Sequence, residues 1–313
     1  MRLSSRMIAL LLSLVMLFSL VTVTASAESL TEGSFTYTVN EDGTTATIIG
    51  YDGADAALVI PSTLGGLKVS AIGVDAFSSN YDITSVSIPS SVVTIDAMAF
   101  YNCANLASVE ITPYTLFVGY QAFHGTAYFN NMPSGPVYIG RILYGYAGIM
   151  PANTSITVPY GTASISPYAF YKQTNLKAIY LPVGMRAIES FAFMGCTNLL
   201  TMRVPPSVTM IGDAAFLNAG GNVTIYGVNG SAMDEYADTE GLFFSHDETL
   251  DFPDGDVNRD KAVDSRDLRI LMRMLLIDGL AVDEERVASC DLVYDGTVDS
   301  ADIRALLRRS VGL

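Results

Sequence analysis

The sequence predicts a mainly β solenoid followed by a small all-α module, and two periodicities in the chain support this division. Phenylalanines recur at a step of 23 residues, at Phe77, Phe100 and Phe123 and then at Phe170, Phe193 and Phe216. Two acidic loops, 256–267 and 291–302, lie 35 residues apart, and an apolar run at helical spacing follows each of them. A fixed period of about 20–30 residues is typical of a solenoid whose turns bury each other's faces.

The N-terminus has the pattern of a secretory signal peptide. Arg2 and Arg6 precede an uncharged run from Met7 to Val23, and the small residues Ala-Ser-Ala at 25–27 supply a cleavage site. The alternative is an uncleaved membrane anchor. No later segment approaches the ~20 apolar residues that a bilayer span requires. We therefore expect residues 1–27 to be removed and the mature protein to be secreted and soluble, with no membrane span.

The charge of the chain limits its partners. The formal net charge is −15, although only 16% of the residues are charged and half are apolar. Such a surface repels nucleic acid and anionic lipid. We therefore expect neither nucleic acid nor a lipid surface among the partners.

Each repeat is expected to contain one short strand with a single buried face. The pattern Leu-x-x-Val-x-Ile at 106–111 recurs with apolar substitutions at 176–181 and 199–204, and its end alternates as a half-buried strand does. Asn105, Asn175 and Asn198 stand just before these strands, where an amide side chain can bond the backbone of adjacent turns. We interpret the asparagines and the recurring phenylalanines as structural.

Two stretches of the repeat region resemble a known family. The lines VVTIDAMAFYNCANLASVEI (92–111) and MRAIESFAFMGCTNLLTMRV (185–204) are similar to the BspA-like leucine-rich repeats of bacterial surface and secreted proteins. The resemblance covers 34–246 with the caps included, and it implies a leucine-rich-repeat solenoid domain over 28–246. We expect a strand–turn–strand around Asp42-Gly43 at its start and a short helix, from Ser231 as N-cap through Tyr236, at its end. The segment 136–148 interrupts the repeat and is expected to form one atypical turn.

The first acidic loop has the spacing of a calcium site. Side-chain oxygens stand at places 1, 3, 5, 9 and 12 of twelve residues, and a backbone carbonyl stands at place 7: Asp256, Asn258, Asp260, Asp264 and Asp267, with Ala262. Calcium suits this all-oxygen set better than zinc or copper, since no thiolate or imidazole is offered. The alternative is a solvated acidic turn, and the presence of a second such loop at a fixed offset argues against it.

The second loop repeats this set with one gap. Its ligands would be Asp291, Asp295, the carbonyl of Thr297, Asp299 and Asp302. Place 3 is Val293, which offers no side-chain oxygen, so the second ion should bind more weakly or rely on water. The first loop has Lys261 at place 6, where a glycine usually makes the sharp turn.

Together, the two loops and their following helices (265–277 and 300–311) resemble a type I dockerin over 254–313, joined to the solenoid by an acidic linker at 247–253. The resemblance implies calcium at two sites and binding to a cohesin on a cellulosome scaffold. In dockerins, places 10 and 11 of each loop contact the cohesin, and two arginines here share one place in the latter half of each helix. The predicted cohesin-binding residues are therefore Ser265, Arg266, Arg273, Ser300, Ala301 and Arg308.

The cysteines and histidines do not assemble a recognisable active site. Cys103 and Cys196 are four repeat turns apart, about 19 Å at ~4.8 Å per strand, too far for a disulfide. Cys290 is expected to be free as well. His124 and His246 have no recognisable Ser or Cys nucleophile beside them, and we interpret both as surface or cap residues. A pair of carboxylates of the glycosidase kind cannot be judged by counting residues.

The outward positions of the repeat strands form the candidate ligand face. Ser87, Glu110, Tyr180 and Arg203 alternate with buried residues and, aligned by the period, form a ribbon across neighbouring turns. Tyr180 beside Arg203 offers an amphipathic patch of the kind found on recognition surfaces. The alternative is that these four are merely polar outward residues.

These observations predict a secreted, non-catalytic binding or adhesion module attached to a cellulosome scaffold through calcium-dependent dockerin–cohesin binding. Its solenoid ligand would be an unidentified protein or glycan, and its role would accompany polysaccharide degradation. Two alternatives remain at this point: a carbohydrate-active enzyme of the glycoside hydrolase kind, and a structural or inhibitor subunit.

Overall fold

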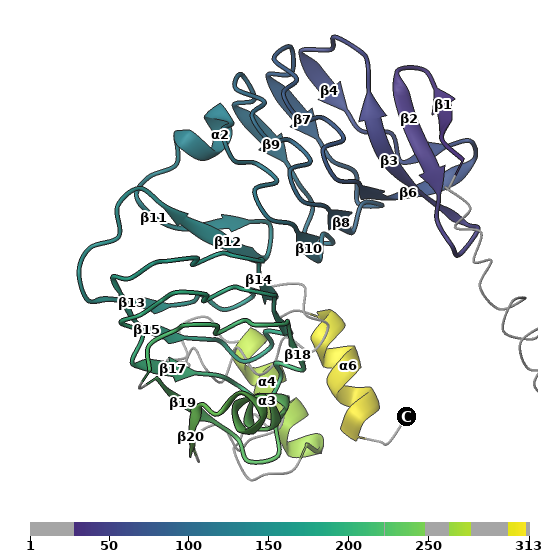
Figure 1. Cartoon of the computed structure of the whole chain (residues 1–313). Helices are drawn as coiled ribbons and strands as arrows, with labels where there is room; N and C mark the ends of the chain where they lie inside the picture. The colour runs from purple at the N-terminus through teal and green to yellow at the C-terminus, as the bar shows by residue number, and fades with distance from the viewer. Residues whose placement is uncertain (1–27, 222, 248–262, 277–299, 311–313) are drawn as a thin grey trace, which may run out of the picture.

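The computed structural model describes residues 28–221, 223–247, 263–276 and 300–310. Figure 1 shows short strands stacked turn upon turn along a curved solenoid. The first half contains β1 (Leu30–Glu32), β2 (Phe35–Val39), β3 (Thr45–Tyr51), β4 (Ala57–Val59), β5 (Thr63–Leu64), β6 (Leu67–Ile72), β7 (Ser85–Ser87), β8 (Thr94–Ile95), β9 (Ser108–Glu110), β10 (Phe117–Val118) and α2 (Ala127–Asn130). The second half contains β11 (Gly135–Ile139), β12 (Ile142–Ala147), β13 (Thr154–Thr157), β14 (Ser164–Ile165), β15 (Leu176–Tyr180), β16 (Ala187–Ile188), β17 (Thr201–Arg203), β18 (Met210–Ile211), β19 (Thr224–Gly227), α3 (Ala232–Glu240) and β20 (Phe243–His246).

Each half of the solenoid has two strand ladders. In the first half one sheet runs β1-β2-β3-β6-β8-β10, with β5 beside β6, and the other runs β4-β7-β9. In the second half the sheets run β11-β12-β14-β16-β18 and β13-β15-β17-β19-β20. Strands of successive repeats pair in parallel, as β7 with β9 and β15 with β17. The mainly β solenoid that the repeat period predicts is confirmed.

The recurring phenylalanines form the centre of the core. Phe100 stacks on Phe77 and Phe123 with ring centroids 4.9 and 5.3 Å apart, and Phe193 stacks on Phe170 and Phe216 at 5.4 and 5.2 Å. The five rings from Phe77 to Phe193 are fully buried. Each regular repeat therefore adds one aromatic ring to one of two stacks of three, which the segment between Phe123 and Phe170 separates.

The asparagines before the strands tie neighbouring turns together. The side-chain amides of Asn105, Asn175 and Asn198 donate to the carbonyls of Tyr81, Met150 and Thr174 at 2.7, 2.8 and 2.7 Å. Each acceptor lies in the preceding repeat. The structural interpretation of these asparagines is confirmed.

The two described cysteines are buried thiols. Cys103 and Cys196 are both free, and their thiols donate to the carbonyls of Phe77 and Phe170 at 2.9 and 3.0 Å. Burial raises the pKa of Cys103 to about 11 and that of Cys196 to about 12, so both stay protonated at neutral pH. The prediction that they do not pair is confirmed. Cys290 lies outside the described residues.

The segment that interrupts the repeat is a β-hairpin. β11 and β12 pair antiparallel around Gly140, which has φ of 58°, and β12 then pairs in parallel with β14. The glycine supplies the left-handed conformation that a tight hairpin turn needs. The expected single atypical turn is thus a strand pair, one strand of which joins the second half of the solenoid.

Tyr144 of this hairpin completes the hydrogen bonding of the first half. In regular repeats the amide of the stacked phenylalanine donates to a carbonyl of the next turn, as Phe100 N does to Ala122 O at 2.8 Å. At Phe123 the amide donates instead to the hydroxyl of Tyr144, at 3.0 Å. The tyrosine therefore replaces a backbone carbonyl at the point where the repeat is interrupted.

Replacing Tyr144 with phenylalanine should destabilise the solenoid by about 1–3 kcal/mol, because the buried amide of Phe123 loses its acceptor. The free energy of unfolding in urea measures this. Tyr138→Phe, in the paired strand, is the matched control, since the Tyr138 hydroxyl makes no hydrogen bond within the described part of the chain. Equal stabilities of the two variants would show that the Tyr144 hydroxyl has no such role.

Both predicted caps are present. β2 and β3 form the N-terminal strand–turn–strand, in which Asp42 accepts hydrogen bonds from the hydroxyl and amide of Thr45 and the amide of Thr44. These bonds lower the pKa of the Asp42 carboxyl to about 2. At the other end, Ser231 caps α3 by accepting from Asp234 N at 3.3 Å.

The helix of the C-terminal cap, α3, is longer than the sequence predicts. It continues past Tyr236 to Glu240, because Gly241 adopts a left-handed φ of 68° and provides the stop signal.

The predicted signal peptide, 1–27, lies outside the described residues. None of the helices in the described ranges is long and apolar enough to cross a bilayer.

Candidate functional site

Two C-terminal helices occupy the positions predicted for the acidic module. α4 (Ser265–Leu276) and α6 (Ser300–Ser310) contact each other. Leu306 of α6 is fully buried. The two helices begin 35 residues apart, as their loops do. The small all-α part of the predicted fold is therefore present.

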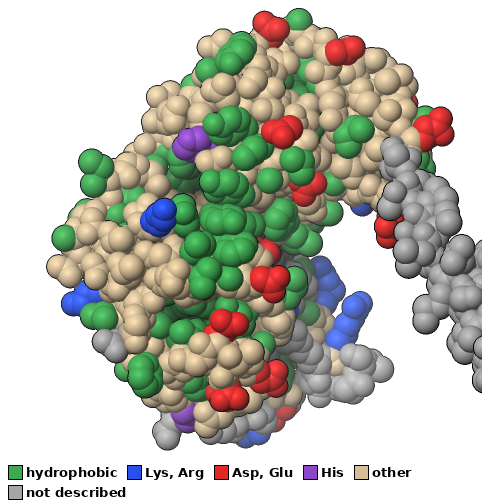
Figure 2. All heavy atoms as spheres, viewed as in Figure 1, with side chains coloured by type: hydrophobic (Ala, Val, Ile, Leu, Met, Phe, Trp, Pro, Cys, Tyr) green, Lys and Arg blue, Asp and Glu red, His purple; other side chains and the backbone are tan. Residues whose placement is uncertain are grey.

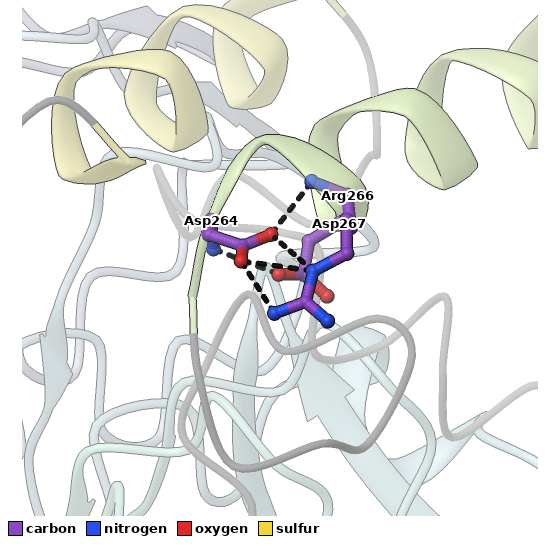
Figure 3. A network of polar contacts seen from close by, with 3 residues as sticks. All are labelled: Asp264, Arg266 and Asp267. Atoms are coloured by element: carbon purple, nitrogen blue, oxygen red, sulfur yellow. Dashed lines mark hydrogen bonds and ion pairs between the residues drawn. The ribbon is translucent and has the colours of Figure 1, made fainter.

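The last acidic residue of each loop points inward. Asp267 and Asp302 lie in the first turns of α4 and α6, and both have 0% exposed surface. Asp267 Oδ2 accepts a hydrogen bond from Asp264 N at 2.8 Å (Figure 3). Buried carboxylates require a compensating charge or hydrogen bonds. This burial at matching positions suits two oxygen ligands that face a hard cation.

Asp264, at place 9 of the first loop, is held by an arginine. Its carboxylate accepts from the amide of Arg266 and forms an ion pair with Arg266 Nη2 at 2.7 Å, as Figure 3 shows. These hydrogen bonds lower the pKa of the Asp264 carboxyl. One predicted ligand therefore contacts one predicted cohesin-binding residue, whose side chain is 56% exposed.

The other predicted residues of this module divide into two groups. Ser265 and Arg273 lie on α4, and Ser300, Ala301 and Arg308 lie on α6; the Ser265 and Arg308 side chains are exposed. Asp256, Asn258, Asp260, Ala262, Asp291, Asp295, Thr297 and Asp299 lie outside the described residues. Among the residues that are described, no group of three metal-ligating side chains gathers. The described carboxylates are the kind of donor that calcium prefers, and so they fit it.

The predicted ligand face is divided between two sheets. Ser87 and Glu110 are directly opposite each other on β7 and β9, and the Ser87 hydroxyl donates to Glu110 at 2.9 Å. Tyr180 and Arg203 are opposite each other on β15 and β17 of the other ladder. The structure thus brings together each neighbouring pair, but the β11–β12 hairpin separates the two pairs along the solenoid (Figure 1).

Two residues of this face were not predicted. Arg203 also lies opposite Tyr226 of β19, and its Nε forms an ion pair with Asp247 at 2.9 Å. Tyr226 stands 23 residues after Arg203, so the repeat step alone could have identified it. Asp247 follows the last strand and belongs to no repeat, so periodicity gave no signal for the ion pair.

Carboxylates with raised pKa do not form a glycosidase pair. Burial raises the pKa of Asp96 and of Glu189, which occupy the same place in different repeats. At least three strand spacings separate them, about 14 Å, whereas glycosidase carboxyls stand ~5–10 Å apart. His124 and His246 are both exposed, as predicted for surface or cap residues.

Comparison with protein families matches both parts of the chain. The BspA type leucine rich repeat region matches in six copies over residues 68–140 and 149–229. The dockerin type I domain matches residues 254–309. A type I dockerin implies calcium and attachment to a cohesin, and leucine-rich repeats imply a binding module. Neither kind of domain is catalytic.

Several solved structures of leucine-rich-repeat proteins are similar to this chain. The T. pallidum leucine-rich-repeat protein is 22% identical, with 70% of this chain and 98% of that chain covered and a TM-score of 0.37. A leucine-rich cell surface protein from Faecalibacterium prausnitzii is 30% identical; the match covers 66% of this chain but only 56% of that protein, with a TM-score of 0.39. A Bacteroides ovatus leucine-rich-repeat protein is 17% identical, with 63% and 82% covered and a TM-score of 0.31.

Among curated proteins, none matches the chain. The two family matches agree with the aromatic stack of the solenoid and with the paired C-terminal helices. The chain therefore belongs to the BspA-type leucine-rich-repeat proteins and carries a C-terminal type I dockerin domain.

Proposed function

We propose that this protein is a secreted, non-catalytic binding module that a calcium-loaded dockerin attaches to a cellulosome scaffold. In this proposal residues 1–27 are a signal peptide, 28–246 the solenoid with its caps, 247–253 a linker and 254–313 the dockerin. The single observation that carries it is the burial of Asp267 and Asp302 at matching positions of two helices, within a region that matches the dockerin family.

Calcium would be held by two loops of unequal strength. The first ion takes Asp256, Asn258, Asp260, the Ala262 carbonyl, Asp264 and Asp267. The second takes Asp291, Asp295, the Thr297 carbonyl, Asp299 and Asp302, and it binds more weakly because Val293 offers no oxygen. When bound, the ions neutralise the clustered carboxylates and allow the loops to fold onto the helices.

The cohesin would contact the start of each helix. Ser265 and Arg266 on α4, and Ser300 and Ala301 on α6, are the equivalent contacts, with Arg273 and Arg308 further along the helices. The two sets differ in chemistry, since Arg266 has alanine as its counterpart. We therefore propose that one docking orientation is preferred over the other.

The solenoid would bind its ligand, an unidentified protein or glycan, on its strand face. Support for binding rather than catalysis comes from the wide separation of Asp96 and Glu189 and from the hydrogen bond that occupies Glu110. The proposed role accompanies polysaccharide breakdown outside the cell, where proteins with type I dockerins and BspA-type repeats are found.

A panel experiment tests this proposal. The full chain, immobilised, should capture type I cohesins in calcium and release them when a chelator is added. A parallel screen of the same chain against glycans, host proteins and bacterial cell surfaces should identify a ligand that is bound without being altered. Hydrolysis of any polysaccharide by the chain would refute the non-catalytic assignment, and failure to capture any cohesin would refute the attachment.

A further inference from the structure

We propose that the strand face around Tyr180, Arg203 and Tyr226 binds an acidic polysaccharide, and that the carboxylate of Asp247 occupies the position of a uronate carboxylate. This inference rests on the proposed function, because it names the ligand class of the binding module. It involves two residues, Tyr226 and Asp247, that sequence reasoning did not assign to the face.

The three residues form a straight row across the sheet. Tyr180 lies opposite Arg203, and Arg203 lies opposite Tyr226, on the consecutive parallel strands β15, β17 and β19. Both tyrosines have 38% of their surface exposed. Two strand spacings separate them, about 10 Å. The row therefore places an exposed tyrosine on each of the two strands that flank the strand of Arg203.

Asp247 lies on the same face of the sheet. Tyr226 is opposite Ser245 of β20, and side chains alternate along a strand, so residue 247 faces the same way as residue 245. The amide of Asp247 donates to the carbonyl of Gly227 at 2.7 Å, which fixes its backbone beside the sheet. Its carboxylate can therefore meet Arg203 only across the surface that the tyrosines flank.

The ion pair between Arg203 and Asp247 has the chemistry of ligand recognition. Nε of Arg203 meets Oδ2 of Asp247 at 2.9 Å, with the two side chains 22% and 18% exposed. A guanidinium is a planar fork that suits carboxylates. Because both side chains are partly shielded, solvent screens the pair less than it screens a fully exposed salt bridge. Asp247 thus acts as a built-in competitor for a ligand carboxylate.

Charge favours an anionic partner at this ladder and not at the other. Among the described strands of the β13–β20 sheet the formally charged residues are Lys177 and Arg203, both basic. The β4-β7-β9 ladder carries Glu110 instead. In Figure 2, one blue side chain lies at the left edge, level with β13 and β15 in Figure 1, others lie further inward and near α6, and red side chains gather towards β18 and α3. With Asp247 included, this face carries two basic residues and one acidic residue, a local excess of positive charge in a chain of net charge −15.

The other outward residues favour a sugar chain over a protein surface. Apart from Ala178, which is nearly buried, they are hydroxylic or aromatic: Ser155, Thr157, Thr201, Thr224, Phe243 and Ser245. Hydroxyl side chains donate to and accept from sugar hydroxyls, and tyrosine rings offer amphipathic contact area. The core of a protein interface is usually more apolar. The row therefore suits an extended chain of uronate rings.

Binding of soluble oligogalacturonides to the full chain, measured by calorimetry at fixed low calcium, tests this inference. Arg203→Gln should weaken binding about tenfold or more, because a charge-assisted hydrogen bond is lost. Asp247→Asn keeps an oxygen for Arg203 but removes the competing charge, so binding should tighten severalfold. Glu235→Gln, which removes an exposed negative charge in the first turn of α3, is the matched control and should change nothing. Added salt should weaken binding in the wild type.

Three outcomes would overturn the inference. The first is equal binding of the same oligosaccharides after methyl esterification, which removes their charge. The second is preference for polyglutamate, which would indicate an acidic protein partner. The third is an absence of oligogalacturonide binding in both the wild type and Asp247→Asn. Cohesin capture, measured on every variant, should remain unchanged, so failure here is distinguishable from failure of the proposed function.

Discussion

The double variant Asp256→Ala with Asp267→Ala loses cohesin binding by more than about a hundredfold, since metal binding provides the folding free energy of a small metal-dependent domain. Asp267 has no exposed surface at the start of α4, and its removal leaves the other carboxylates of the loop without a shared counter-ion. Surface plasmon resonance against a cohesin in calcium measures the effect.

The control is an acidic residue in a similar local position. Glu235 is exposed in the first turn of α3, and Glu235→Ala should leave cohesin affinity unchanged. The pair Asp291→Ala with Asp302→Ala, in the weaker second loop, should reduce affinity less than the first pair. Unchanged affinity in the Asp256/Asp267 variant would refute the assignment of the first loop.

Phe193→Ala destabilises the solenoid by about 3–5 kcal/mol, a large part of the ~5–15 kcal/mol that separates a typical folded domain from its unfolded state. Phe193 is fully buried between Phe170 and Phe216, with ring centroids 5.4 and 5.2 Å away. Its removal opens a cavity that rigid strands on both sides cannot fill. Urea denaturation measures the loss.

An exposed aromatic residue of a neighbouring repeat position provides the comparison. Tyr171 is 37% exposed, and Tyr171→Ala should cost less than about 1 kcal/mol. Cohesin capture should survive in both variants at temperatures where the solenoid is folded. Similar losses for Phe193→Ala and Tyr171→Ala would show that the buried stack does not dominate stability.

The repeat architecture was predictable because a single apolar residue per turn reports the period directly. The step from Phe77 to Phe100 is also the step that stacks their rings, so sequence periodicity and spatial packing are one property. The gap between Phe123 and Phe170 did not predict a hairpin. Its length is close to two turns, and only Tyr144, which bonds the Phe123 amide, shows where the regular pattern is replaced.

The backbone of the turns was harder to predict. Eleven non-glycine residues in the described part of the chain adopt φ between 52° and 61°, and six of them recur at one place per repeat: Asp75, Met98, Gln121, Tyr168, Phe191 and Ala214. In a sequence, a positive φ is usually inferred from the presence of a glycine. Here hydrogen bonds between turns impose them, as when Met98 N donates to Tyr120 O at 2.9 Å. Because side-chain chemistry varies at this place, the sequence carries no signal for it.

The candidate site was likewise predictable in one part and not in another. Oxygen ligands at fixed loop spacing predicted the carboxylates that are buried at the starts of α4 and α6. The ion pair of Arg203 with Asp247 joins residues 44 positions apart, one of them outside any repeat, so no local or periodic pattern indicates it. Whether two such distant residues meet depends on where the chain leaves the last strand of the solenoid.

A calcium titration of a single metal-free sample tests whether metal binding folds the dockerin domain. The purified full chain is stripped of metal and titrated with calcium while helical circular dichroism and cohesin affinity are recorded together. We expect the helical signal to rise and cohesin binding to appear over the same calcium range, and EDTA to reverse both. A chain that shows the same spectrum and captures cohesin equally well in EDTA would contradict it.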